Sequence, residues 1–160
     1  MQRATKANIL VALQFSLLGG LSLSSHFSTN TTYFPATTFL MIFGFIVLIL
    51  AYFALRPSLR ISPIPKNGAQ FISQGVYKYV RHPMYLGLLS IGMALAANAS
   101  NAIGWGLYLL LIATLNVKAN FEDQLLREIH PESFHYQMHT SKILPCLGGS
   151  CRDTCEFKYK

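Results

Sequence analysis

Two long stretches without a charged residue constrain the fold of this chain more than any other feature. No Lys, Arg, Asp or Glu occurs in residues 7–55, and a second charge-free stretch covers residues 83–117. Each is longer than the roughly 20 apolar residues that one helix needs to cross a bilayer. The whole chain is 52% hydrophobic and only 12% charged, which is too apolar for an ordinary soluble domain. We therefore expect an integral membrane protein whose main partner is the lipid bilayer.

A polar break near the middle of each stretch, at residues 24–32 and 98–101, divides it into two segments. Each stretch therefore predicts a helical hairpin, and the chain an all-α polytopic protein with about four spans. We place the spans near residues 8–23, 35–55, 84–98 and 102–118. The last two are short for about 30 Å of hydrocarbon, so we expect a tilted second hairpin whose last helix extends into the cytosol.

A signal peptide is the alternative interpretation of the N-terminal segment, because basic residues precede an apolar stretch. The small residues at 19–23 form only a loose cleavage pattern, and a second apolar segment follows closely. We therefore expect the first segment to be retained.

The basic residues are placed as in a membrane protein with cytosolic loops. The net charge is +7, and Arg3 and Lys6 precede the first span. The loop at residues 56–83 carries five basic residues and no acid, whereas both short connectors lack Lys and Arg. The positive-inside rule then puts both termini and this loop in the cytosol. Basic loops also suit anionic lipid, so the charge needs no nucleic-acid partner.

Three units follow from this pattern. Residues 1–55 form an N-terminal hairpin, and residues 56–145 combine the basic loop, the second hairpin and a C-terminal cover. Residues 146–160 are predicted to be a loosely ordered tail. The spacing of its cysteines matches no common zinc motif, so we expect no metal site. These cysteines are Cys146, Cys151 and Cys155.

A cluster of polar residues lies where the basic loop meets the third predicted span. Pro83 suits the first turn of a helix, because proline lacks the N–H that would be unpaired there. Arg81 and His82 are thereby placed beside free backbone N–H groups and the positive end of the helix dipole, which attract a carboxylate. The alternative is a basic interfacial flank that anchors the helix, with nearby tyrosines as an aromatic belt.

A second polar cluster follows the fourth predicted span. Four polar residues share one helical face: Asn116, Asn120, Asp123 and Arg127. Lys118 and Glu122 are spaced for an i,i+4 pair, as are Asp123 and Arg127. The adjacent acids Glu122 and Asp123 suit the hydroxyl and ammonium groups of a cofactor. The alternative is a helix that emerges into water, where such charge pairs are routine.

Together the two clusters resemble the isoprenylcysteine carboxyl methyltransferase family and its phospholipid methyltransferase relatives, over residues 55–145. The family's Arg-His-Pro, Tyr and Gly pattern is met by Arg81, His82, Pro83, Tyr85 and Gly87. Its lead-in, paired acids with leucine, and closing residues resemble Gly75 to Val80, then Glu122, Asp123 and Leu126, then Tyr136, Lys142 and Pro145. Val76 and Ser141 stand where the family often has proline, and Asp123 is one methylene shorter than the usual glutamate.

The resemblance implies a methyltransferase that uses S-adenosylmethionine on a lipophilic acceptor, most simply carboxyl O-methylation of an isoprenylcysteine-like lipid. His82, Tyr85, Glu122 and Asp123 are then expected at the cofactor, with Arg81 either anchoring a carboxylate or orienting the site. Arg81 and His82 are the candidate catalytic residues. An amine or thiol acceptor must lose a proton, and His82 would then be a candidate base. The alternatives are a phospholipid amine or small thiol as acceptor, and a non-catalytic membrane protein.

Overall fold

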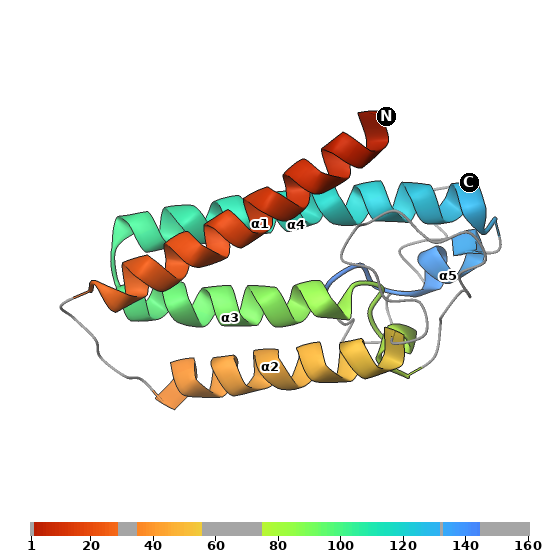
Figure 1. The fold of residues 1–160 in the computed structure, drawn as a ribbon. Helices are drawn as coiled ribbons and strands as arrows, with labels where there is room; N and C mark the ends of the chain where they lie inside the picture. The colour runs from red at the N-terminus through yellow and green to blue at the C-terminus, as the bar shows by residue number, and fades with distance from the viewer. Residues whose placement is uncertain (1, 29–34, 56–74, 132, 145–160) are drawn as a thin grey trace, which may run out of the picture.

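The computed structural model describes residues 2–28, 35–55, 75–131 and 133–144, and the named elements in these ranges are all helices (Figure 1). The elements are α1 (Gln2–His26), α2 (Pro35–Leu55), the 3-10 helix η1 (Gly75–Lys78), α3 (Pro83–Ala99), α4 (Ala102–Ile129) and α5 (Ser133–His139). The predicted all-α fold is thus confirmed. Predictions for residues 56–74 and for Pro145 and the cysteine tail lie outside the described residues.

The four long helices lie side by side and alternate in direction (Figure 1). Helix α2 packs against α3, while α1 packs against both α3 and α4. The start of α3 and the end of α4 therefore lie at the same end of the bundle, beside η1 and α5. We call this the charged end, and the end at the α3–α4 turn the neutral end.

Three helices are long and apolar enough to cross a membrane: Arg3–His26, Pro35–Leu55 and Ala102–Ile129. Helix α3 is apolar but shorter, as the short third span predicted. Helix α4 is one continuous helix far beyond residue 118, which agrees with the predicted extension. Helix α1 ends three residues beyond the predicted end of the first span at residue 23. Helix α1 continues through Ser24 to His26, and the hydrogen bond from Phe27 N to Leu23 O follows its last turn.

The core of the bundle lies between α1, α3 and α4. Its buried side chains are Leu17, Leu21, Tyr85, Ala96, Leu111, Leu115 and Ala119. Helix α2 instead exposes many large apolar side chains, Phe39, Phe45 and Phe53 among them. An exposed apolar helix face is costly in water and suits lipid, which agrees with a membrane protein.

Helices α2 and α3 approach closely at a pair of glycines. A Cβ atom added to Gly87 would lie 2.8 Å from Gly44 O, and one added to Gly44 would lie 2.8 Å from Gly87 O. Small residues that let two backbones come this close are typical of membrane helix contacts. Gly87 of the sequence motif is therefore explained by packing, one turn away from the polar residues of the same motif.

Uncharged groups hold the neutral end together. Ser100 ends α3 in a left-handed conformation with φ 49°, and its N–H donates to Ala96 O. Asn101 caps α4, since its Oδ1 accepts from Gly104 N at 2.7 Å. Ser28, which follows α1, donates to Ala99 O at 2.8 Å. The second hairpin thus turns tightly without any ion pair among these residues.

Candidate active site

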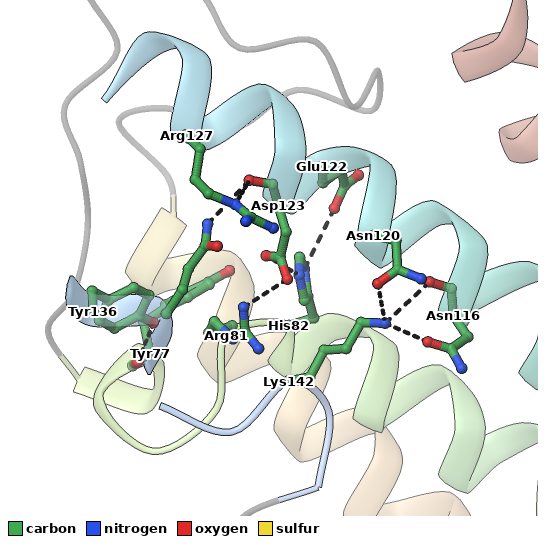
Figure 2. Close-up of polar contacts among 11 residues, drawn as sticks. Tyr77, Arg81, His82, Asn116, Asn120, Glu122, Asp123, Arg127, Tyr136 and Lys142 are labelled. Atoms are coloured by element: carbon green, nitrogen blue, oxygen red, sulfur yellow. Dashed lines mark hydrogen bonds and ion pairs between the residues drawn. The ribbon is translucent and has the colours of Figure 1, made fainter. Parts of the chain in front are cut away.

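The charged end brings together the two polar clusters that the sequence singled out. Arg81 and His82 lie at the start of α3, and Glu122 and Asp123 face them from α4 (Figure 2). The segment after α5 closes the arrangement through its backbone. Arg81 N donates to Ser141 O at 2.8 Å, and His82 N donates to Lys142 O at 3.0 Å. The predicted C-terminal cover therefore lies directly against the Arg81-His82 step.

Asp123 is the hub of the cluster. Its Oδ2 accepts from Arg81 Nη1 at 2.7 Å, and its Oδ1 lies 2.9 Å from His82 Nε2. The Asp123 side chain is 7% exposed. Its backbone oxygen accepts from Gln137 Nε2 at 3.1 Å and from Arg127 Nε at 3.3 Å. Both carboxylate oxygens of Asp123 are thus engaged within the protein, and Arg127 contacts its backbone rather than its carboxylate.

His82 lies between two carboxylates. Its Nδ1 is 3.5 Å from Glu122 Oε2, opposite the Nε2 contact with Asp123. Burial lowers the pKa of His82, but hydrogen bonds and charge attraction from Asp123 and Glu122 outweigh it and raise the pKa above its ordinary value. The imidazole also stacks on Tyr85, with ring centroids 5.1 Å apart and planes 6° from parallel. His82 is therefore fixed in place and favours its charged form.

Glu122 is the more accessible of the two acids. Its side chain is 25% exposed, against 7% for Asp123. Its Oε2 lies beside His82, which stacks on Tyr85, so the carboxylate borders the aromatic side of the site. Of the two predicted cofactor acids, Glu122 is therefore the one that a ligand can reach more easily.

Two tyrosines connect η1 to α5 at the back of the cluster. The Tyr136 hydroxyl donates to the backbone oxygen of Tyr77. Burial raises the pKa of Tyr136 to about 12, with Asp123 adding to the rise and Arg81 opposing it. Burial also raises the pKa of Tyr77. Both phenols are uncharged at neutral pH, so they serve as neutral hydrogen-bonding groups and packing surface.

Lys142 attaches the C-terminal segment to α4 (Figure 2). Its Nζ donates to Asn120 Oδ1 at 2.7 Å, to Asn116 O at 3.3 Å, and also to Asn116 Oδ1. On the polar face predicted for α4, Asn116 and Asn120 thus accept hydrogen bonds from Lys142, and Asp123 accepts one from Arg81. A cavity of about 460 Å³ lies beside this attachment, and Arg81, Asn116 and Lys142 are among its lining residues. This volume is in the range of small-molecule sites.

Two residues next to the site, Gln14 and Lys118, make contacts that the sequence did not predict. Lys118 is buried, and its Nζ donates to Gln14 Oε1 of α1 at 2.8 Å. The same ammonium lies 5.2 Å from the centroid of the Tyr85 ring. Gln14 carries no motif, and Lys118 was expected to pair with Glu122 by spacing. Only the crossing of α1 and α4 brings Gln14 to this position.

Residues 36–128 match the profile of the isoprenylcysteine carboxyl methyltransferase family. The match covers more than half of the chain. The chain belongs to this family. The match contains every residue predicted for the site, and α1 and the Lys142 segment lie outside it. A search among curated proteins found no match to the chain.

Membership makes the chain an integral membrane protein of a methyltransferase family, in agreement with its apolar helices. Methyltransferases of the isoprenylcysteine carboxyl methyltransferase family use S-adenosylmethionine as the methyl donor. Among the described residues, no group of three or more His, Cys, Asp or Glu side chains is placed to hold a metal ion. Its contacts bring Arg81, His82, Tyr85, Glu122 and Asp123 into one cluster at the charged end.

Proposed function

We propose that the chain is an S-adenosylmethionine-dependent methyltransferase that methylates the carboxylate of an isoprenylcysteine-like lipophilic acceptor at the cytosolic boundary of the membrane. The observation that carries this proposal is the state of His82. Both of its ring nitrogens face carboxylates, at 2.9 Å and 3.5 Å, and its pKa is raised. A charged imidazole held in this way has no free lone pair with which to take a proton.

This state of His82 favours a carboxylate acceptor over an amine or a thiol. A carboxylate is already ionised at neutral pH and needs no base before it attacks a methyl group. An amine or thiol acceptor must lose its proton to a group within hydrogen-bond reach. The site accordingly suits catalysis by orientation and exclusion of water, with His82 and Arg81 as fixed positive groups.

The residues present fit the cofactor. Glu122 keeps an accessible carboxylate beside the stacked rings of His82 and Tyr85, which suits the ammonium or hydroxyl groups of a cofactor. Asp123 is buried and both of its oxygens contact Arg81 or His82, so we assign it the role of holding these two residues in place. S-adenosylmethionine supplies an electrophilic methyl group on a positively charged sulfur. The protein's part is to hold the two ligands in line and to keep water out.

The surroundings of the site support a lipophilic acceptor. Helices α2, α3 and α4 are apolar, and the polar cluster lies where α3 begins and α4 ends. An acceptor whose chain remains in this apolar region gains about 0.8 kcal/mol for each buried methylene, so a chain of about fifteen carbons supplies most of the binding. Its polar head then reaches the charged end.

The orientation in the membrane is also part of the proposal. The basic residues Arg3, Lys6, Lys78 and Arg81 lie toward the charged end, whereas the neutral end has no charged residue in its described turn. The positive-inside rule then places the charged end and both termini in the cytosol. An impermeant thiol reagent applied outside sealed cells should leave Cys155 unlabelled, and rapid labelling would reverse the orientation.

The acceptor is tested by transfer of a labelled methyl group to a series of thioether carboxylates with short, geranyl and farnesyl chains, at fixed detergent. We expect activity to rise steeply with chain length. The matched series replaces the carboxylate by an amine or leaves a free thiol, and we expect little transfer to either. A flat response to chain length, or a preference for the amine or the thiol, would rule out the lipid carboxylate while leaving methyl transfer intact.

A further inference from the structure

The cavity next to the cluster has a one-sided charge. Its described lining includes the cations Arg81 and Lys142 and contains no Asp or Glu. The two acids of the site contact Arg81 and His82 and are absent from that described lining. The remaining polar lining groups are neutral, such as Asn116 and Gln137. A cavity with this lining attracts an anion rather than a cation.

Lys142 is the lining cation that is free to change partners. Its described hydrogen bonds all go to uncharged oxygens of Asn116 and Asn120. Hydrogen bonds between an ammonium and a carboxylate are roughly twice as strong as those between neutral groups. Burial lowers the pKa of Lys142, with Asp123 opposing and Arg81 adding to the change, and an arriving anion would relieve that cost. Nζ can therefore exchange an amide oxygen for a ligand carboxylate.

Arg81 adds a second unused donor. Its Nη1 is committed to Asp123, but its Nε is buried and has no hydrogen-bond partner in the described structure. Buried polar groups are usually paired, so a ligand oxygen that reached this N–H would gain a hydrogen bond that the protein does not provide. Arg81 itself must stay in place because it also neutralises Asp123. Lys142, which has no acidic partner among its described hydrogen bonds, is thus the better anchor for an arriving anion.

We infer that this cavity is a carboxylate-binding site in which Lys142 is the anchoring residue and Arg81 a fixed secondary donor. The inference rests on the proposed function and deepens it, because that reaction involves two carboxylates. One belongs to the acceptor, and the other to the amino-acid end of S-adenosylmethionine. The sequence suggested Arg81 as the carboxylate anchor, and we now assign this role mainly to Lys142. Lys142 lies on the segment outside the family match.

The test compares Lys142→Met, which removes the charge, with Lys142→Arg, which keeps it. Lys78→Met serves as the control, because Lys78 is an exposed basic residue of η1. Each protein is titrated by calorimetry with S-adenosylmethionine, with decarboxylated S-adenosylmethionine, and with a farnesyl thioether carboxylate in the absence of any methyl donor. The thermal unfolding of each variant is recorded in the same detergent.

We expect Lys142→Met to weaken one carboxylate ligand by roughly 10- to 100-fold, and Lys142→Arg to restore most of that affinity. Weaker binding of S-adenosylmethionine, with decarboxylated S-adenosylmethionine unaffected, identifies the cofactor as the source of the carboxylate. Weaker binding of the farnesyl carboxylate alone identifies the acceptor.

Unchanged affinity for both carboxylates in a stably folded Lys142→Met protein would overturn the inference, as would an equal loss for decarboxylated S-adenosylmethionine. A parent protein that binds neither form of the cofactor would instead contradict the proposed function, and the farnesyl carboxylate arm would still decide the role of Lys142.

Discussion

The helices are held together by different chemical groups at the two ends of the bundle. At the neutral end, the side chains of Asn101, Ser24 and Ser28 close the turn with uncharged hydrogen bonds. At the charged end, Arg81, His82 and Asp123 are held together by ionised groups that are largely withdrawn from solvent. The neutral end joins α1 to α3 and α4, and the charged end joins α3 to α4, so charge is not required for joining the helices.

The difference indicates that the charged end is built for chemistry. Ionisable groups within a membrane bundle are costly, and those that occur there usually mark a functional site. Uncharged serine and asparagine side chains would have joined the helices at a lower free-energy cost at both ends. The comparison therefore predicts that changes at the charged end affect activity and pH dependence, whereas changes at the neutral end affect stability alone.

The largest effect is expected for Asp123→Asn. The substitution leaves Arg81 and His82 without their main counter-charge, and removing one partner of a buried ion pair costs about 3 to 5 kcal/mol. We expect this loss in the free energy of unfolding in detergent, together with loss of methyl transfer. Glu128→Gln is the control, because its ion pair with Arg3 is 42% and 64% exposed and should contribute at most about 1 kcal/mol. Similar losses for both variants would break the comparison.

Gly87→Ala tests whether a motif residue can serve packing alone. The added methyl group would lie 2.8 Å from Gly44 O and from Leu48 Cγ, so α2 and α3 must move apart. Overpacking of this kind costs about 1 to 3 kcal/mol, measurable as a lower unfolding temperature. Gly106→Ala on α4 is the control, since nothing lies within 4 Å of its added Cβ. A fully stable Gly87→Ala protein without activity would instead assign Gly87 to ligand contact.

Asn101→Ala sharpens the comparison from the neutral end. Loss of the N-cap of α4 should lower the free energy of unfolding by about 0.5 to 2 kcal/mol. Asn101→Ser keeps a capping oxygen and should recover most of that stability. We expect both variants to methylate the acceptor at the parent rate at temperatures where they are folded. Inactive but folded Asn101→Ala protein would show that the two ends are coupled.

The smallest effect is the pH dependence of stability that His82 introduces. Its pKa in the folded protein is raised above the unfolded value of about 6.5, so its contribution is complete below pH 6.5. That contribution is lost as the pH rises through the folded pKa. The parent protein should lose stability over this interval, while His82→Gln should show a flatter profile. A parallel profile for the two proteins would mean that His82 is not held in its charged form.

The membrane fold could be predicted from the sequence because bilayer thickness fixes helix length. The two charge-free stretches and their polar breaks predicted the four long helices, although α1 packs against α3 and α4 rather than against α2. The boundary near His26 was less certain, because serine and histidine are tolerated in a last helical turn. Helix α1 therefore ran further than the polarity of its sequence suggested.

The partners within the site were less predictable, because helical spacing reveals only neighbours on one helix. Arg127 was expected to bind the Asp123 carboxylate, but Arg81, which precedes Asp123 by 42 residues, takes that position from a more buried side. Lys118 likewise finds Gln14, 104 residues away, rather than an acid of its own helix as its hydrogen-bond partner. Which of several possible partners a side chain binds depends on burial, and burial depends on how the helices cross.

The central claim is that the charged end binds S-adenosylmethionine, with Glu122 as the acid that contacts it. Glu122→Ala removes an accessible carboxylate from a partly buried site, and loss of one charge-assisted hydrogen bond costs about 1.5 to 3 kcal/mol. The control is Glu128→Ala, which removes an acid from the same helix at its exposed pair with Arg3.

Calorimetric titration of S-adenosylmethionine into the detergent-purified parent and these two variants tests the claim most directly. The account predicts measurable binding to the parent, affinity roughly 10- to 150-fold weaker for Glu122→Ala, and unchanged affinity for Glu128→Ala. Equal affinities of all three folded proteins would remove Glu122 from the site, and no binding to the parent would contradict the central claim itself.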